Sequence, residues 1–129
     1  MNLGETNRAM GITRVDIKVC RIDQPSLCRA VKDAVVDTGA TASAIPSDVI
    51  KELRIKLPIK RRFTLATGRS VVRQVGSAWI EYDGRKASDD IISTKRGPAL
   101  LSVTALEHLG FEVDPRTGKL KKLEGSLLL

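Results

Sequence analysis

The spacing of hydrophobic residues along the chain predicts a fold built mainly from short β-strands. Apolar and charged side chains alternate over residues 13–19, and an extended pattern resumes over residues 27–36 after the turn-forming segment 23–26. Such alternation puts one set of side chains on a buried face and the other set in solvent. The two segments therefore predict a hairpin at the start of an all-β domain.

Turn chemistry predicts two further hairpins downstream. The dipeptide Asp83-Gly84 separates the strand-like residues 75–82 and 85–93, and it is a strong signal for a two-residue turn. Residues 111–113 and 119–123 flank a segment that contains proline and glycine, which favours a C-terminal hairpin. Most of the chain is thus expected to lie in antiparallel pairs of strands.

Two short helices are expected between the strands. Ser47 can cap a helix over residues 48–54, which has an apolar side and is followed by a proline. Ser102 can cap a second helix over residues 103–109, and Gly110 can close it. Both helices are too short to form a layer of their own, so the fold class stays all-β.

The length of 129 residues favours one domain with its own core. We expect an N-terminal arm over residues 1–10, the domain over 11–123 and a tail over 124–129 that ends in three leucines. No apolar run is long enough to span a bilayer, and the first residues lack the order of a secretory signal. A cytoplasmic protein with no membrane partner is the expectation.

Cysteine and histidine are scarce, which excludes several kinds of site. Cys20 and Cys28 face each other if the first hairpin is symmetric about Gln24, so a disulfide is conceivable, although the expected cytoplasmic location favours two reduced thiols. With His108 as the one histidine there is no zinc-ligand cluster and no imidazole for Ser/His/Asp or Cys/His hydrolysis. We expect no metal and no cofactor, and His108 is expected to be solvated at a helix end.

The net charge of +7 is concentrated in one stretch of the chain. Eight of the 22 basic residues but one of the 15 acidic residues lie within residues 51–75, so the rest of the chain carries 14 of each sign. A solvated basic face is the favoured interpretation, ahead of a preference for acidic substrates or a nucleic-acid surface. The content of one Trp, one Tyr and two Phe leaves few stacking platforms, which argues against a nucleic-acid partner.

The most informative stretch is residues 34–46. An apolar run rich in β-branched residues brings Asp37 to the end of a strand, where Thr38 and Gly39 turn the backbone. Gly39 permits a backbone geometry or a close approach that a side chain would forbid. A loop of this kind can hold a carboxylate among backbone N–H groups, which fixes its orientation.

This stretch resembles the active-site loop of aspartic proteases, in particular the retropepsin-like group of single-domain dimeric enzymes. The family signature reads here Asp37-Thr38-Gly39-Ala40, with Ser43 and Ile45 at its later fixed positions. The alternative is an ordinary β-turn after a buried strand. A second family hallmark, two hydrophobic residues and a glycine before a short helix, resembles Leu100-Leu101 followed by Ser102 in the glycine position. The resemblance covers residues 11–123.

The resemblance implies a closed, barrel-like acid-protease fold and a homodimeric endopeptidase. In that chemistry two carboxylates share one proton and activate a water molecule that attacks a peptide bond. Each subunit would supply its Asp37, with Thr38, Gly39 and Ala40 as the supporting residues of the loop. Partners are then a second copy of the chain and a peptide or protein substrate.

The resemblance also places a flap, the hairpin that closes over bound peptide, at residues 63–72. Thr67 and Gly68 lie at its predicted tip, where the alternative is a plain surface turn. A second active-site carboxylate is not found in the chain: Asp89-Asp90 are adjacent on a predicted strand, point to opposite faces and are expected to be solvent groups. The alternative function is a catalytically silent dimer that binds a peptide or protein.

Overall fold

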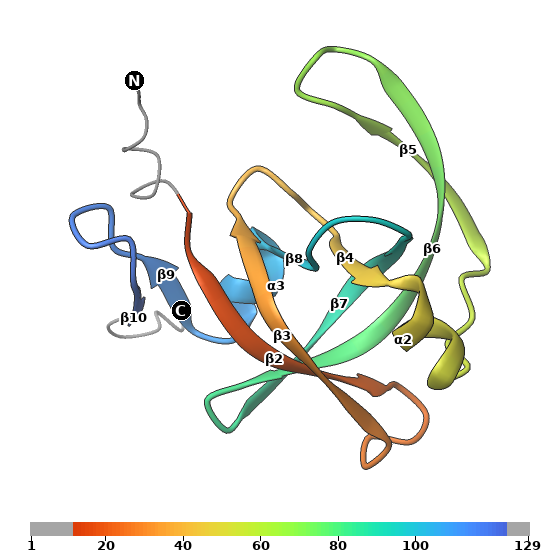
Figure 1. Ribbon diagram of the computed structural model, residues 1–129, viewed down its shortest axis with the longest axis horizontal. Helices are drawn as coiled ribbons and strands as arrows, with labels where there is room; N and C mark the ends of the chain where they lie inside the picture. Colours follow the sequence, from red (N-terminus) through yellow and green to blue (C-terminus); the bar gives the residue numbers. More distant parts are fainter. Residues whose placement is uncertain (1–11, 124–129) are drawn as a thin grey trace, which may run out of the picture.

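The computed structural model describes residues 12–123, and these form a ring of strands with two short helices (Figure 1). The predicted arm over 1–10 and tail over 124–129 lie outside the described residues. No helix within residues 12–123 is long and apolar enough to cross a membrane. The elements are β2 (Arg14–Arg21), β3 (Cys28–Asp37), β4 (Ser43–Pro46), α2 (Ser47–Glu52), β5 (Ile59–Thr64), β6 (Ser70–Tyr82), β7 (Arg85–Thr94), β8 (Leu100–Ser102), α3 (Val103–His108), β9 (Phe111–Val113) and β10 (Leu120–Lys122).

The main sheet has seven strands in the order β2-β3-β8-β4-β7-β6-β5, and a further pairing of β2 with β6 closes it. Two of the pairings, β3 with β8 and β4 with β7, are parallel, and the others are antiparallel. Strands β9 and β10 form a separate hairpin. The closed, barrel-like all-β fold predicted from the sequence is confirmed.

The interior of the ring is filled by the apolar set of each alternating strand. Val19 of β2, Ile80 of β6 and Leu101 of β8 are fully buried, as alternation requires. Leu106 on one face of α3 joins the same cluster, which packs this helix against the sheet. One core therefore holds the strand ends that carry the site.

The predicted hairpin turns are confirmed. Asp83 and Gly84 both have positive φ angles, 52° and 74°, and they connect Tyr82 directly to Arg85 across a two-residue turn. Gly68, with φ of 89°, turns the chain between β5 and β6. Aspartate and glycine adopt this left-handed backbone more easily than other residues, which explains why local sequence located these turns.

The two helix starts differ. Ser102 caps α3 as predicted, because its hydroxyl accepts a hydrogen bond from the Ala105 N–H at 3.0 Å. Ser47 does not cap α2: it is the first helical residue, and Pro46 holds the cap position without a side-chain hydrogen bond. The strand β4 continues through Pro46, which lies opposite Thr94 of β7, and this pairing fixes where the helix begins.

Cys20 and Cys28 form a disulfide, so the expectation of two reduced thiols is wrong. The register of β2 against β3 places the two residues directly opposite each other, with Cα atoms 4.0 Å apart. The hairpin is therefore symmetric in the way that the sequence allowed. The disulfide joins β2 to the first residue of β3, whereas Asp37 is the last residue of β3.

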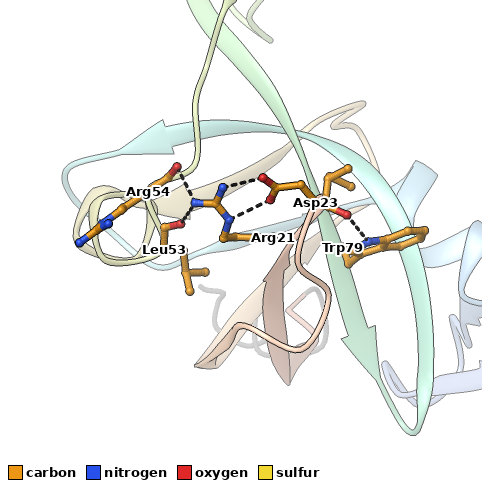
Figure 2. A network of polar contacts seen from close by, with 6 residues as sticks. Arg21, Asp23, Leu53, Arg54 and Trp79 are labelled. Carbon is orange, nitrogen blue, oxygen red and sulfur yellow. Dashed lines mark hydrogen bonds and ion pairs between the residues drawn. The ribbon is translucent and has the colours of Figure 1, made fainter.

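Figure 2 shows a polar network that fastens α2 to the ring. The Arg21 guanidinium donates two hydrogen bonds to the Asp23 carboxylate, at 2.9 and 2.7 Å. It also donates to the carbonyl oxygens of Leu53 and Arg54 at the end of α2, at 2.8 and 3.1 Å. The Trp79 indole N–H donates to the backbone carbonyl of Ile22 at 3.4 Å. A single arginine thus satisfies carbonyls that the helix end leaves without partners.

Candidate active site

Asp37 is the last residue of β3 and is half-buried. Val36 before it is buried in the core, and the parallel register places Asp37 beside Ser102 of β8. Because β3 is paired on both sides, by β2 and β8, its end is a fixed point of the fold. The predicted delivery of one carboxylate to a strand end is confirmed.

Thr38 and Gly39 form the predicted turn after the strand. The Gly39 N–H donates to the Asp37 carboxylate at 3.0 Å, and the Ala40 N–H donates to the Asp37 backbone carbonyl at 3.1 Å. The Ala40 carbonyl in turn accepts from the N–H of Val103, the first residue of α3, at 3.1 Å. The turn is therefore held from both ends, and the carboxylate is oriented by a backbone N–H.

Gly39 is not required by the backbone of a single chain. Its φ lies outside the left-handed region, and a Cβ atom placed on it would stand 3.5 Å from the Asp37 carboxylate oxygen, an ordinary contact. The predicted steric or conformational need for glycine is thus absent within one chain. The exposed turn instead leaves open space beside the carboxylate.

A buried carboxylate, that of Asp89, lies behind this turn. Asp89 of β7 is 6% exposed, and one of its carboxylate oxygens accepts from the hydroxyls of Ser43 at 2.6 Å and Ser102 at 2.9 Å. The Ser43 hydroxyl also accepts from the Ser102 backbone N–H at 3.0 Å. The expectation that Asp89 is a solvent group is wrong: it joins β4, β7 and β8 next to the strand position of Asp37.

Burial raises the pKa of the Asp89 carboxyl, and the hydrogen bonds from the Ser43 and Ser102 hydroxyls partly oppose that rise. Asp90 lies on the other face, as the alternation argument required, where its carboxylate accepts from Arg61 of β5 at 2.8 Å. A signal for Asp89 was present in the sequence, because Ala87 and Ile91 two residues on either side belong to the buried set.

Ser102, which stands where the family pattern has glycine, is accommodated by this cluster. Its side chain is fully buried, yet its hydroxyl has both a donor, the Ala105 N–H, and an acceptor, the Asp89 carboxylate. A buried hydroxyl with both functions satisfied carries little penalty. The departure therefore leaves the packing beside Asp37 intact.

A polar cavity of about 220 Å³ opens beside the cluster. Its lining includes Thr41 of the β3–β4 loop, Asp89 and Asp90 of β7, and Thr104 and His108 of α3. His108 is exposed in the last turn of α3, as predicted. The cavity connects the region behind the loop to solvent.

The structure does not bring Thr67 and Gly68 to Asp37 within one chain. They form the tip of the β5–β6 hairpin, where the Gly68 N–H donates to the Leu65 carbonyl at 2.9 Å. Figure 1 shows this hairpin extending beyond the closed part of the sheet, at the end of the molecule where the β3–β4 turn lies. The predicted hairpin is confirmed; its use as a flap stays a prediction.

One group of possible metal ligands occurs among residues 12–123. The sulfur atoms of Cys20 and Cys28 and a carboxylate oxygen of Glu81 lie within 4.8 Å of one another. Both sulfur atoms are consumed by the disulfide, and thiolate is the form that binds metal. These residues therefore do not offer a metal site in the oxidised protein.

Comparison with known proteins defines the class. Residues 20–90, more than half of the chain, match the aspartyl protease family, and this match includes the Asp37 loop and the β5–β6 hairpin. The chain belongs to the aspartyl protease family, and the retropepsin-like resemblance read from its motifs is confirmed. No curated protein matches the sequence.

Among solved structures, the fold is similar to that of the protease of simian foamy virus (mac) in solution. The TM-score is 0.51 at 17% identity, over 74% of this chain and 92% of the viral one. It is also similar to the foamy viral protease-reverse transcriptase in complex with an RNA/DNA hybrid, with a TM-score of 0.50 at 17% identity, over 73% of this chain and 12% of that longer chain. At this identity the likeness describes the retroviral protease fold alone.

Proposed function

We propose that this protein is a homodimeric aspartic endopeptidase in which each subunit contributes its Asp37 to one shared active site. The observation that carries the proposal is the Asp37 turn itself: a half-buried carboxylate at a doubly paired strand end, oriented by the Gly39 N–H, in a chain of the aspartyl protease family. The sequence holds one Asp-Thr-Gly, so a pair of such carboxylates requires two chains.

The chemistry follows from two like charges held close together. Two adjacent carboxylates cannot both ionise readily, so one keeps a proton while the other takes a proton from water. The water attacks the peptide carbonyl, and the protonated carboxyl donates to it, by general acid–base catalysis. The pair titrates as a unit.

The exposed residues of the turn suit this arrangement. The hydroxyl of Thr38 is solvent-exposed in one chain and is available to the Thr38 of a second copy. The open space at Gly39 admits a substrate or a partner close to the carboxylate. Ala40 supports the turn, because its N–H donates to the Asp37 carbonyl and its carbonyl accepts from the Val103 N–H. The β5–β6 hairpin, with Thr67 and Gly68 at its tip, would close over the bound peptide.

Replacement of the catalytic carboxylate tests the proposal directly. Asp37→Asn keeps the shape of the side chain, so we expect an unchanged melting temperature and dimer content but no cleavage of a peptide library between pH 4 and 7. The matched control is Asp48→Asn, an exposed aspartate in the first turn of α2, which should cleave like the wild type. Undiminished cleavage by Asp37→Asn would remove Asp37 from the mechanism.

The rate should depend on pH as a bell-shaped curve with its maximum on the acidic side of neutrality. A shared-proton pair is active only when one of its carboxyls is ionised and the other is protonated. The measurement is kcat/KM for one peptide across pH 3–8. A rate that rises continuously into the alkaline range would contradict a carboxylate pair.

The alternative function is a silent dimer of the same fold that binds a peptide or protein without cutting it. One observation favours it: Gly68 is the one glycine at a hairpin tip that the family often makes glycine-rich. A pepstatin-type transition-state mimic distinguishes the two, because tight binding requires the carboxylate pair. The cytoplasmic location and the lack of a nucleic-acid partner stay predictions.

A further inference from the structure

The β5–β6 hairpin carries a concentrated positive charge. Residues 59–75 contain five basic and no acidic side chains, and all five are exposed. They are Lys60, Arg61, Arg62, Arg69 and Arg73. A hairpin that projects from the sheet into solvent gains nothing for its own pairing from such a set, because like charges close together repel each other.

Among residues 12–123 the charge is largely uncompensated. Arg61 pairs with Asp90 of β7 at 2.8 Å, and none of the other four basic side chains lies within ion-pair distance of a described carboxylate. Arg73 contacts the backbone carbonyl of Val72 at 3.4 Å, and it lies directly opposite Arg61 in the register. The hairpin therefore presents cations that are available to an external anion.

The register sorts these side chains onto two faces. On β6 the core-facing set, which includes Gly76, Ala78 and Ile80, continues toward the tip as Gln74 and Val72. Their partners across the hairpin are Lys60 and Arg62. The opposite face carries Arg61 and Arg73. Lys60 and Arg62 thus extend the inner side of the ring beyond its closed part.

The position of the hairpin relates it to the active-site loop. Arg61 fastens its first strand to Asp90, and Asp90 and Thr41 of the loop line the same cavity of about 220 Å³. The hairpin and the β3–β4 turn lie at the same end of the molecule (Figure 1). A peptide that lies over Asp37 would pass beneath the face that bears Lys60 and Arg62.

We propose that the Lys60 and Arg62 face of the β5–β6 hairpin binds acidic side chains of the substrate, so that the enzyme selects peptides rich in Asp and Glu. Selection of what is cleaved rests on the proposed protease function; binding does not. A peptide is favoured over a nucleic acid because the hairpin's one aromatic side chain, Phe63, lies on the opposite face, and bases have nothing to stack on.

Binding is measured with the Asp37→Asn variant, which holds peptide without cutting it. The probes are two fluorescein-labelled decapeptide pools, identical except that Glu at two fixed positions is Gln in the second pool. An exposed ion pair strengthens binding by up to about fivefold, so with two Glu positions we expect the Glu pool to bind about tenfold more tightly than the Gln pool at low salt. This difference should shrink as added salt screens the charges.

The control is a matched arginine substitution on the other face of the same hairpin. Arg62→Gln should remove most of the preference for the Glu pool, whereas Arg73→Gln, which removes the same charge from the opposite face, should leave it. Equal binding of both pools by the unsubstituted hairpin would overturn the proposal, as would an equal loss from the two arginine variants. Tighter, Arg62-dependent binding of a single-stranded oligonucleotide would reassign the face to nucleic acid and overturn it too.

Cleavage of the two peptide pools by the wild type is measured in a separate assay, which distinguishes failure of the acidic-peptide site from failure of the proposed protease function. Tight binding of the Glu pool with no cleavage of either pool leaves the acidic-peptide site standing and refutes the protease. Cleavage of both pools with equal kcat/KM confirms the protease and refutes selection by the hairpin.

Discussion

The carboxylate of Asp89 is a buried acidic group where three strands of the ring meet. Removing it from water is unfavourable, and two serine hydroxyls that donate to one of its oxygens offset that penalty. One of these hydroxyls, that of Ser102, also accepts a hydrogen bond from the Ala105 N–H at the start of α3. Ser102 therefore couples the sheet behind Asp37 to α3, the helix whose first residue holds the Asp37 turn.

Asp89 should make the free energy of unfolding depend on pH, and comparison with the Asp89→Asn variant separates its contribution from those of other groups. Its folded pKa is raised above the ordinary value of 3.8, so between these values the folded state binds more protons than the unfolded state and stability falls as pH rises. The free energy of unfolding from urea titrations at pH 4–7 should therefore show, in wild type minus Asp89→Asn, a decline with rising pH. A difference independent of pH would contradict the assignment.

Ser102 should carry stability that the glycine of the family pattern would not. Ser102→Ala removes the cap of α3 and one donor to the buried carboxylate, so we expect a loss of about 1–3 kcal/mol in the free energy of unfolding. Ser88→Ala, at an exposed position of β7, is the control and should change it by less than about 0.5 kcal/mol. Equal effects in the urea titrations would show that the hydroxyl of Ser102 is not used.

At this scale the sequence predicts residues whose roles are local. Asp37 and its turn are found from a contiguous motif, and Ser102 from capping chemistry. Asp89 is missed because its partners are 46 and 13 residues away, and a charged residue on a strand is assigned to solvent by default. The predicted steric need for Gly39 is wrong within one chain, because the local sequence does not show that the space beside the turn is open.

The elements are held in place by contacts that the local pattern does not contain. Turn residues located the hairpins at Asp83-Gly84 and Gly68, since positive φ angles are a local property. The start of α2 was misplaced because β4 pairs with β7 through Pro46. The disulfide depends on which residues the hairpin register places opposite each other. The expected cytoplasmic location favours reduced thiols whatever that register is, so the prediction from location is wrong here.

Arg21 should be irreplaceable by lysine at the end of α2. A planar guanidinium can bind the Asp23 carboxylate with two donors while another nitrogen reaches the Leu53 and Arg54 carbonyls, and an ammonium cannot. Arg21→Lys is therefore expected to lower the melting temperature and to increase amide exchange in α2. Arg14→Lys, exposed on the same strand, should leave both unchanged; a matching loss there would contradict the role of Arg21.

The Arg21 pair also contributes to acid sensitivity. The hydrogen bonds from Arg21 hold the pKa of Asp23 below its usual range. Because this folded pKa is lowered, the contribution is present above the ordinary pKa of aspartate and is lost as pH falls through the lowered value.

Reduction of the disulfide should weaken the first hairpin. Closing a loop between cysteines eight residues apart is worth about 2–3 kcal/mol in the chain-entropy account. Urea titrations of the wild type with and without dithiothreitol should differ by that amount, and the Cys20→Ala, Cys28→Ala double variant should not respond. Two thiols per chain, titrated in unfolded protein without reductant, would contradict the bond.

At the scale of the whole molecule, the ring is closed by pairings between distant segments. The β2–β6 contact and the parallel pairs β3–β8 and β4–β7 bring together residues far apart in sequence, and alternation alone does not determine the order of strands. The all-β class follows from the pattern, whereas the closed ring was predicted through the family resemblance. The structure shows why the two motifs occur together: the ring places the end of β3, with Asp37, beside the end of β8, with Ser102.

The central claim is that one active site needs two chains. Wild type and Asp37→Asn are mixed, allowed to exchange subunits, and assayed at constant total protein. After random exchange, about a quarter of the dimers in a one-to-one mixture contain two wild-type subunits. If each site takes one Asp37 from each subunit, these dimers alone are active. The account predicts about a quarter of the wild-type activity, whereas about half would show that each chain carries a complete site and would contradict it.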